Sequence, residues 1–198
     1  MSYVSLALAA VAALVLQAPA ARAIPITFSG NLSGANEVPP VVTPGTGVAT
    51  VILDPTAQTI QINATFSGLT SNDTMAHIHC CAPLGTNVGV ATTVPAFPGF
   101  PLGMTSGTYS SAVFDLTQPT IYNPAFVTLE GGLPQAEAAL IAGIEAGQSY
   151  FNIHTLNNPG GEIRSQLFPA AAPEPTSLAL LGSGLLGVVL TWRRKRAG

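Results

Sequence analysis

The sequence predicts an all-β domain, a Greek-key sandwich or barrel with one short helix, between two apolar terminal segments. The first observation is a succession of β-branched runs separated by Gly, Pro and Asn, the pattern of short strands and turns. The second is one segment, residues 134–147, with helical spacing, a Pro at its start and a Gly at its end. The third is the length of the stretch 24–172, which suits a single domain.

Nine segments are expected to form strands, because turn residues bound runs rich in β-branched and aromatic side chains. They are residues 25–32, 46–54, 58–67, 75–81, 88–94, 108–116, 125–130, 149–155 and 162–168. The turn sequence Asp54-Pro55-Thr56-Ala57 predicts a hairpin between the second and third of them. The segment 95–107 is too rich in Pro and Gly for regular structure, so a loop is expected there.

The predicted domain is acidic and poor in cysteine. Between residues 24 and 172 it has eight acidic residues against one basic residue, Arg164, a formal charge of −7. Such a surface repels a phosphate backbone, so no nucleic-acid partner is expected. With only two cysteines, the hydrophobic core must hold the fold. Because this region has neither a G-x-S-x-G elbow nor a phosphate-binding glycine loop, the sequence does not predict an enzyme.

The first 23 residues have the pattern of a signal peptide. An apolar run at 4–16 is followed by Ala21-Arg22-Ala23, a small-residue cleavage pattern with the cut expected after Ala23. A retained N-terminal anchor is the alternative, but the run is short for a spanning helix. The sequence therefore predicts export.

The C-terminus carries three consecutive features. A linker at 170–176 contains Pro173-Glu174-Pro175, an apolar segment at 177–192 predicts a transmembrane helix, and a basic tail follows at 193–198. The positive-inside rule keeps the basic tail cytoplasmic and the acidic domain outside. A plain tail anchor would explain the helix and the charges but not the Pro-Glu-Pro sequence.

This arrangement resembles the PEP-CTERM sorting signal of bacteria. The resemblance implies processing by an exosortase-like membrane enzyme that cuts at the Pro-Glu-Pro region. The precursor is then expected in the envelope, held in the membrane by its C-terminal helix, and the product at the cell surface or outside the cell.

Three further motifs lie in the domain: LSGANEVPP at 32–40, AHIHCC at 76–81, and YFNIH at 150–154 running into PGGEIRSQL at 159–167. In this order they resemble the CHRD (chordin-type) domain, with the domain expected at 24–169. The resemblance implies an immunoglobulin-like β-sandwich with limited similarity to copper/zinc superoxide dismutases. It does not imply a molecular function.

All three histidines of the chain fall in these motifs. Strand alternation places His77 and His79 on one face, and His154 on the outer face of a second strand with Tyr150 and Asn152. If the two strands are neighbours, three imidazoles meet there, and imidazole suits zinc and copper. Cys81, an acid such as Asp73, or water would take the fourth position. The alternative is a set of hydrogen-bonded surface histidines.

The adjacent pair Cys80-Cys81 allows three interpretations. The first is a vicinal disulfide, which would be strained because neighbouring α-carbons are ~3.8 Å apart, below the usual range for a disulfide. In a regular strand the two thiols would point to opposite faces, which leaves Cys81 free as a ligand. An intermolecular bridge is the third interpretation.

Two charged residues near the end of the domain share a predicted strand face. Glu162 and Arg164 are expected to form a local ion pair beside the last hairpin. Earlier in the chain, Asn36-Glu37 before Val38-Pro39-Pro40 predicts a turn with a buried or loop-anchoring carboxylate.

The sequence thus favours an exported structural or binding module, with extracellular polysaccharide or surface proteins as partners. The competing class is a copper/zinc-binding, superoxide dismutase-like metalloenzyme that uses the three-histidine face. A protein-binding module without a metal is the third option.

Overall fold

A computed structural model describes residues 24–170 of the chain. The predicted cleavage residues Ala21 and Ala23, the sorting residues Pro173, Glu174 and Pro175, and the helix expected at 177–192 lie outside the described residues. Within residues 24–170, no helix is long and apolar enough to cross a membrane.

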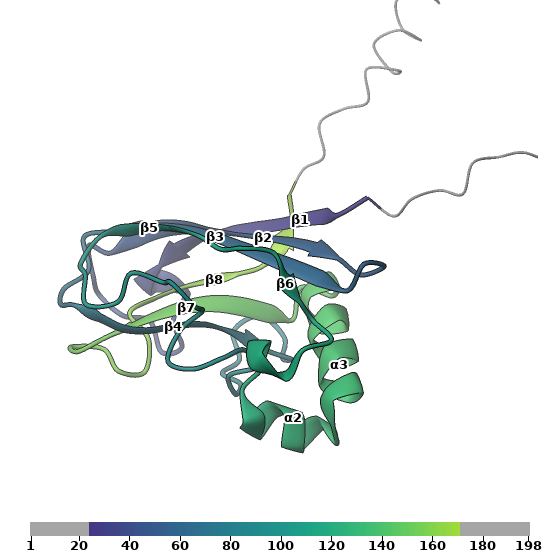
Figure 1. Ribbon diagram of the computed structural model, residues 1–198. Helices are drawn as coiled ribbons and strands as arrows, with labels where there is room; N and C mark the ends of the chain where they lie inside the picture. Colours follow the sequence, from purple (N-terminus) through teal and green to yellow (C-terminus); the bar gives the residue numbers. More distant parts are fainter. Residues whose placement is uncertain (1–23, 171–198) are drawn as a thin grey trace, which may run out of the picture.

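The domain is built on nine antiparallel strands, which confirms the all-β class. They are β1 (Ile26–Ser33), β2 (Thr46–Asp54), β3 (Thr59–Ser67), β4 (Asp73–Cys80), β5 (Gly107–Ser110), β6 (Phe114–Asp115), β7 (Ser149–Thr155), β8 (Ile163–Gln166) and β9 (Phe168–Pro169). The order is β4-β7-β8-β1-β2-β3-β5, with β6 on β3 and β9 on β1. The sheet curls over, so that β1, β2, β3 and β5 form one layer and β4, β7 and β8 the other (Figure 1).

Hydrophobic alternation fixes the register of the first layer. β2 pairs with β3 from Thr46↔Ser67 to Asp54↔Thr59, and the Asp54 carboxylate accepts from the backbone N–H groups of Thr56 and Ala57 in the connecting turn. The predicted hairpin is therefore confirmed, with a side-chain cap in its turn.

The core lies between the two layers and consists largely of every second side chain along the longer strands. Its buried apolar members from the longer strands are Phe28, Leu32, Ala49, Val51, Leu53, Ile60, Ile62, Ala64, Phe66, Ala76, Ile78, Phe151 and Ile153. Burial of a large apolar side chain contributes ~1.5–3 kcal/mol, and a one-residue slip would expose a whole strand's set.

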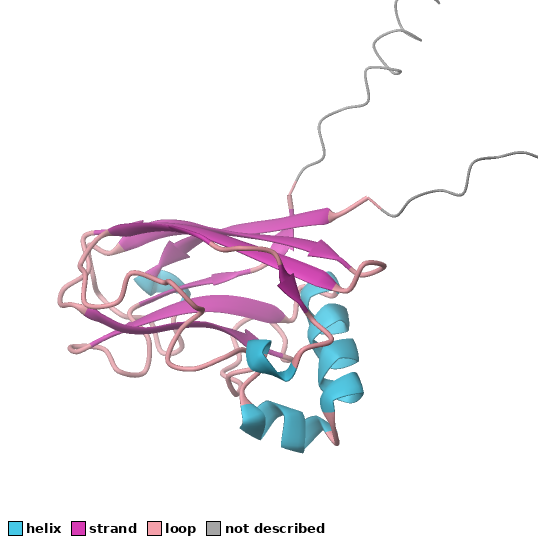
Figure 2. Ribbon diagram, viewed as in Figure 1, coloured by secondary structure: helices cyan, strands magenta, loops and turns pink. Residues whose placement is uncertain are grey.

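Helices close one end of the sandwich (Figure 2). The predicted helix is present as α3 (Leu133–Glu145). The strand predicted at 125–130 is wrong, because this segment is α2 (Pro124–Glu130). The Asn123 side chain accepts from the Ala125 N–H, Pro124 occupies the first turn, and Gly131 ends the helix in the left-handed conformation. The β-branched composition of the segment outweighed these helix signals in the sequence prediction.

Other predicted elements are shorter or divided. The segment 88–94 makes only isolated bridges, His79↔Val90 and Thr92↔Tyr122, and so is not a strand. The segments 108–116 and 162–168 each contain two short strands rather than one. Two 3-10 turns, η1 (Gly34–Asn36) and η2 (Pro119–Ile121), complete the described elements.

Candidate metal centre

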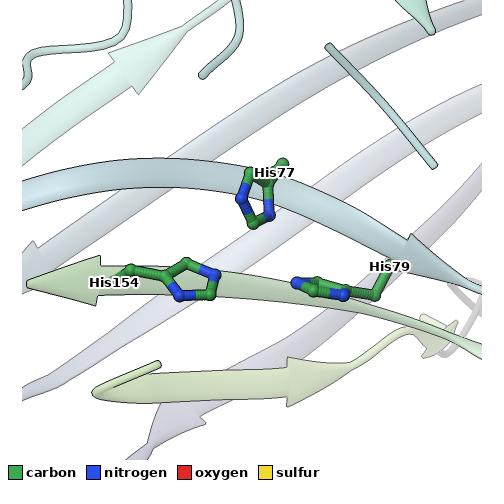
Figure 3. A group of neighbouring side chains, drawn as sticks. All are labelled: His77, His79 and His154. Carbon is green, nitrogen blue, oxygen red and sulfur yellow. The ribbon is translucent and has the colours of Figure 1, made fainter. Parts of the chain in front are cut away.

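β4 and β7 are neighbours, and this brings all three histidines together. The register pairs Met75 with His154, His77 with Asn152, and His79 with Tyr150. Ring centroids are 4.6 Å apart for His77 and His154, 4.9 Å for His77 and His79, and 5.8 Å for His79 and His154. One nitrogen from each ring lies within 4.8 Å of the others, and Figure 3 shows the three rings gathered between the strands. The sequence predicted this shared face correctly.

The face is not open to solvent, which corrects the expectation of an outer surface. His77, His79 and His154 are only 1%, 8% and 5% exposed. Loop segments cover the β4–β7 face: the Val88 carbonyl meets His79, and the Asn87 amide donates to the Val38 carbonyl. Strand alternation distinguishes the two faces of a sheet but does not say what packs over them.

Each imidazole has a buried nitrogen without a partner. The Nδ1–H of His79 donates to the Val88 carbonyl at 2.7 Å, and that of His154 donates to the Pro159 carbonyl at 3.0 Å. Because a carbonyl oxygen only accepts, these bonds place the proton on Nδ1 and leave Nε2 with a free lone pair. Both Nε2 atoms, and Nδ1 of His77, are buried and unpartnered. Backbone carbonyls orient metal-binding histidines in this way.

The environment keeps the three rings neutral. Burial, reinforced by the charges of His154 and His79, lowers the pKa of His77 to about 2. Burial also lowers the pKa of His79 to about 4, against the opposing hydrogen bond to Val88, and lowers the pKa of His154. A neutral imidazole is the form that binds a metal ion, so the site needs no deprotonation at neutral pH.

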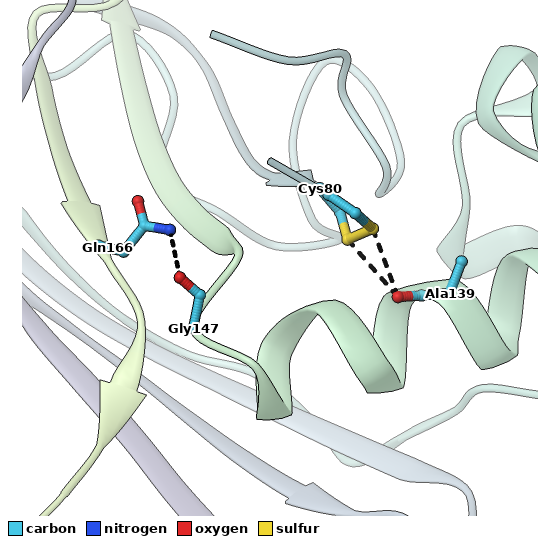
Figure 4. The surroundings of a disulfide bond; sticks show 5 residues. Cys80, Ala139, Gly147 and Gln166 are labelled. Carbon is cyan, nitrogen blue, oxygen red and sulfur yellow. Dashed lines mark hydrogen bonds between the residues drawn. A yellow bond between two sulfur atoms is a disulfide. The ribbon is translucent and has the colours of Figure 1, made fainter. Parts of the chain in front are cut away.

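The structure corrects the assignment of Cys81 as a ligand. Cys80 and Cys81 are joined by a disulfide, so neither offers a thiolate. Their sulfur atoms contact the Ala139 carbonyl oxygen of α3 at 3.6 and 3.3 Å (Figure 4). A Cβ at Gly143 would overlap both sulfurs, so glycine is required where α3 passes this bond. Of the three interpretations of the cysteine pair, the structure contains the vicinal disulfide.

Asp73, the other protein candidate for the fourth position, is also absent from the cluster. Its carboxylate is buried at the start of β4 and accepts from the Met104 N–H. Burial raises its pKa despite the backbone hydrogen bonds that lower it. Within residues 24–170, the candidate ligands that the structure brings together are therefore the three histidines alone.

The ion pair expected between Glu162 and Arg164 is not formed. The Glu162 carboxylate accepts from hydroxyl and amide groups of Thr43, Thr70, Thr155 and Asn158. These donors satisfy it without a cation, and β8 begins only at Ile163, one residue later.

The Arg164 guanidinium has other partners. It lies 4.1 Å from the centre of the Tyr150 ring and donates to the Asn87 side chain and the Thr86 carbonyl. These contacts hold the cation against the loop that covers His79.

Glu37 is a site residue whose role the sequence did not reveal. The predicted turn is confirmed as η1, with the Glu37 side chain buried and accepting from the Asn152 amide at 3.4 Å. Burial raises its pKa to about 7, although the Arg164 charge and the Asn152 hydrogen bond lower it. The alternation of side chains along β7 placed Asn152 on the histidine face. No local pattern linked Asn152 to Glu37, which lies 115 residues earlier.

The fold and these contacts define a β-sandwich domain with a buried three-histidine cluster. Residues 28–167 match the protein-family model of the CHRD domain, and residues 171–195 match that of the PEP-CTERM protein-sorting motif. The chain therefore belongs to the CHRD domain family and carries a PEP-CTERM motif, which indicates an exported protein sorted by an exosortase. No curated protein and no solved structure matches the chain.

Proposed function

We propose that the chain is a structural or binding module of the cell surface or extracellular matrix whose CHRD domain binds one zinc or copper ion. His77, His79 and His154 supply the ligands. Exosortase-dependent processing at Pro173-Glu174-Pro175 delivers it, after the segment 177–192 has held the precursor in the membrane. Extracellular polysaccharide or other surface proteins are the partners we propose for the module.

The observation that carries the metal proposal is the set of three unpartnered imidazole nitrogens. A buried polar atom without a partner costs ~1–3 kcal/mol, and native structures contain few of them. The three rings that carry these atoms lie together, with one nitrogen of each within 4.8 Å of the others, so the unsatisfied atoms are concentrated in one place. A single cation bound by all three lone pairs would satisfy them.

The donor set favours zinc or copper over calcium and magnesium. Neutral imidazole nitrogens suit zinc and copper, whereas calcium and magnesium prefer oxygen ligands. The carbonyls of Val88 and Pro159 fix two of the rings, which lowers the ordering cost of binding. Redox catalysis of the superoxide dismutase type was the alternative, and no finding supports it.

The test is the metal content of the full-length chain, purified without a polyhistidine tag. After treatment with a chelator, the protein is loaded with Zn²⁺ or Cu²⁺, dialysed and measured by mass spectrometry. We expect one ion per chain in the wild type and none in the His77→Ala/His79→Ala variant. His154→Gln, which keeps a polar side chain, should lose at least tenfold in affinity.

Gln61→Ala is the matched control. Its amide donates to the Ser111 carbonyl in the opposite layer, so it removes a polar side chain without touching the cluster. A wild-type chain that is folded by circular dichroism and holds no ion would disprove the metal site. Equal metal content in the wild type and both histidine variants would disprove the ligand assignment.

A further inference from the structure

Two more buried acceptors have no partner; they belong to two side chains in contact with each other, one of which adjoins the histidines. They are Oε1 of Glu37 and Oδ1 of Asn152, on side chains that are 5% and 2% exposed. Asn152 is the cross-strand partner of His77 and precedes His154 by two residues on the same face of β7. Cross-strand side chains have Cβ atoms ~4.5–5.5 Å apart, so the Asn152 amide adjoins the cluster.

The two oxygens converge on one place. Both lie within 2.8 Å of the position that a Cβ of Gly161 would take, and Gly161 has φ +125°. Only a residue without a side chain fits there, because any Cβ would displace the Glu37 and Asn152 groups. The backbone thus leaves room for the Glu37 and Asn152 side chains to meet at Gly161.

These five unpartnered atoms can all accept, His77 in the tautomer with its proton on Nε2, but they need different partners. The three imidazole nitrogens can share a cation, whereas a carboxylate oxygen and an amide oxygen next to them need an O–H or N–H donor. A water bound to the cation has two hydrogens to donate, one for each oxygen. Neither Cys81, in its disulfide, nor Asp73, held by Met104, competes for the fourth position.

We infer that the fourth position of the histidine site is an exchangeable water that donates to Asn152 and Glu37, and that small monodentate anions replace it. This inference rests on the proposed metal site. It makes the site open rather than structural, since closed zinc sites fill four positions with protein ligands.

The surroundings provide an attractive charge. A pocket of about 460 Å³ reaches Glu37 and Arg164, although none of the three histidines lines it. Arg164 is the one basic residue between residues 24 and 170, and its charge lowers the pKa of both Glu37 and His79. The single cation of an acidic domain thus lies beside the candidate site, where it favours an incoming anion.

Azide titration of the Co²⁺-loaded full-length chain tests this inference. Cobalt replaces zinc in such sites, and its visible spectrum reports its ligands. We expect a saturable spectral change with one azide per cobalt, as azide displaces water, and recovery of the first spectrum on dialysis. A bound cobalt whose spectrum does not respond to azide would overturn the open position and leave the metal site standing. A chain that binds no cobalt, zinc or copper would remove both.

Glu37→Gln tests the part assigned to the buried carboxylate. Burial raises the pKa of Glu37 to about 7, so the titration is done above that pH, where the group is ionised. There the substitution removes a negative charge beside the bound anion and weakens the hold on the water, so the azide Kd should fall about tenfold. Glu137→Gln is the control. Glu137 is also buried, but it lies on α3, away from the cluster, and its carboxylate accepts a hydrogen bond from the Gln58 side chain. Equal azide affinities in the two variants would overturn the assignment of Glu37.

Discussion

Tyr150 and His79 stack in parallel across β4 and β7, with ring centroids 4.6 Å apart and 9° between the planes. Both side chains also bond to the backbone of one residue of the covering loop, Val88. The Tyr150 hydroxyl accepts from the Val88 N–H and donates to its carbonyl, the same carbonyl to which His79 donates. The tyrosine therefore fixes the group that sets the tautomer of His79.

Tyr150→Phe should weaken metal binding more than it weakens the fold. The ring and its stacking remain, but the two hydroxyl contacts to Val88 are lost, which costs ~1 kcal/mol of stability. Because the Val88 carbonyl is then less firmly placed, we expect a five- to tenfold loss of zinc affinity, on the order of the effect of outer contacts around metal ligands. Competition with a chromogenic chelator measures the affinity, and urea unfolding measures the stability.

Tyr109→Phe is the matched control for this change. The Tyr109 hydroxyl also donates to a loop carbonyl, that of Pro98, at 3.0 Å, but in the opposite layer. Tyr109→Phe should lower the free energy of unfolding about as much as Tyr150→Phe does and leave the zinc affinity unchanged. If both variants lower the affinity equally, the effect is one of general stability and the role given to Tyr150 is wrong.

The sequence predicted that the histidines would share a face because that arrangement depends on local periodicity. His77 and His79 share a face by alternation alone, and the same rule placed His154 and Asn152 together in the second strand. The pairing of β4 with β7 was an assumption, since about 70 residues separate them and no local pattern determines which strands become neighbours. The structure confirms that assumption.

What covers the face could not be predicted, because it depends on contacts between distant loops. The Val88, Asn87 and Glu37 groups come from irregular segments without periodicity. The burial of the histidines, the Arg164 stack on Tyr150 and the role of Glu37 all follow from those segments. The helix α2 was missed for a different reason. Its cap residues Asn123 and Pro124 are local helix signals, but the prediction gave more weight to the β-branched residues of the segment.

The metal-free protein should lose stability as the pH falls below about 6.5. Burial lowers the pKa of His77 to about 2 and of His79 to about 4, and lowers that of His154, from an ordinary value of 6.5. Below pH 6.5 the unfolded chain therefore binds protons that the folded chain excludes. Each such histidine lowers the free energy of unfolding by about 1.4 kcal/mol per pH unit in that range.

The buried acids oppose this trend without cancelling it. Burial raises the pKa of Glu37 to about 7 and also raises that of Asp73, so the folded chain keeps protons that the unfolded chain releases as the pH rises. The two histidines whose pKa values fall furthest, His77 and His79, outweigh the one acid raised to about 7, Glu37, so stability should increase as the pH rises from 5 to 6.5. Urea midpoints in the presence of a chelator measure it, and His154→Gln should reduce the slope. A wild-type stability that falls as the pH rises from 5 to 6.5 would contradict the assigned burial effects.

Glu162→Gln should be among the most destabilising single changes in the domain. The Glu162 carboxylate accepts from the Thr70 N–H and hydroxyl, both at 2.8 Å, from Thr155 at 2.6 Å, from Asn158 at 3.1 Å, and from Thr43. It thereby joins the loop before β2, the loop before β4 and the end of β7. A glutamine replaces one acceptor oxygen by an NH₂ group that faces donors, so we expect a loss of about 3 kcal/mol in urea unfolding.

The pH dependence of that loss separates the carboxylate from a simple packing effect. Burial alone would raise the pKa of Glu162, but the hydrogen bonds from Thr155, Thr43 and Thr70 outweigh it and lower the pKa. Its stabilising contribution is therefore present above pH 4.5 and fades as the pH falls through the lowered value. The difference between wild type and Glu162→Gln should shrink in acid, while the exposed control Glu145→Gln stays within ~0.5 kcal/mol of the wild type at neutral pH. A difference that is constant with pH would show that the charge of Glu162 does not hold these loops together.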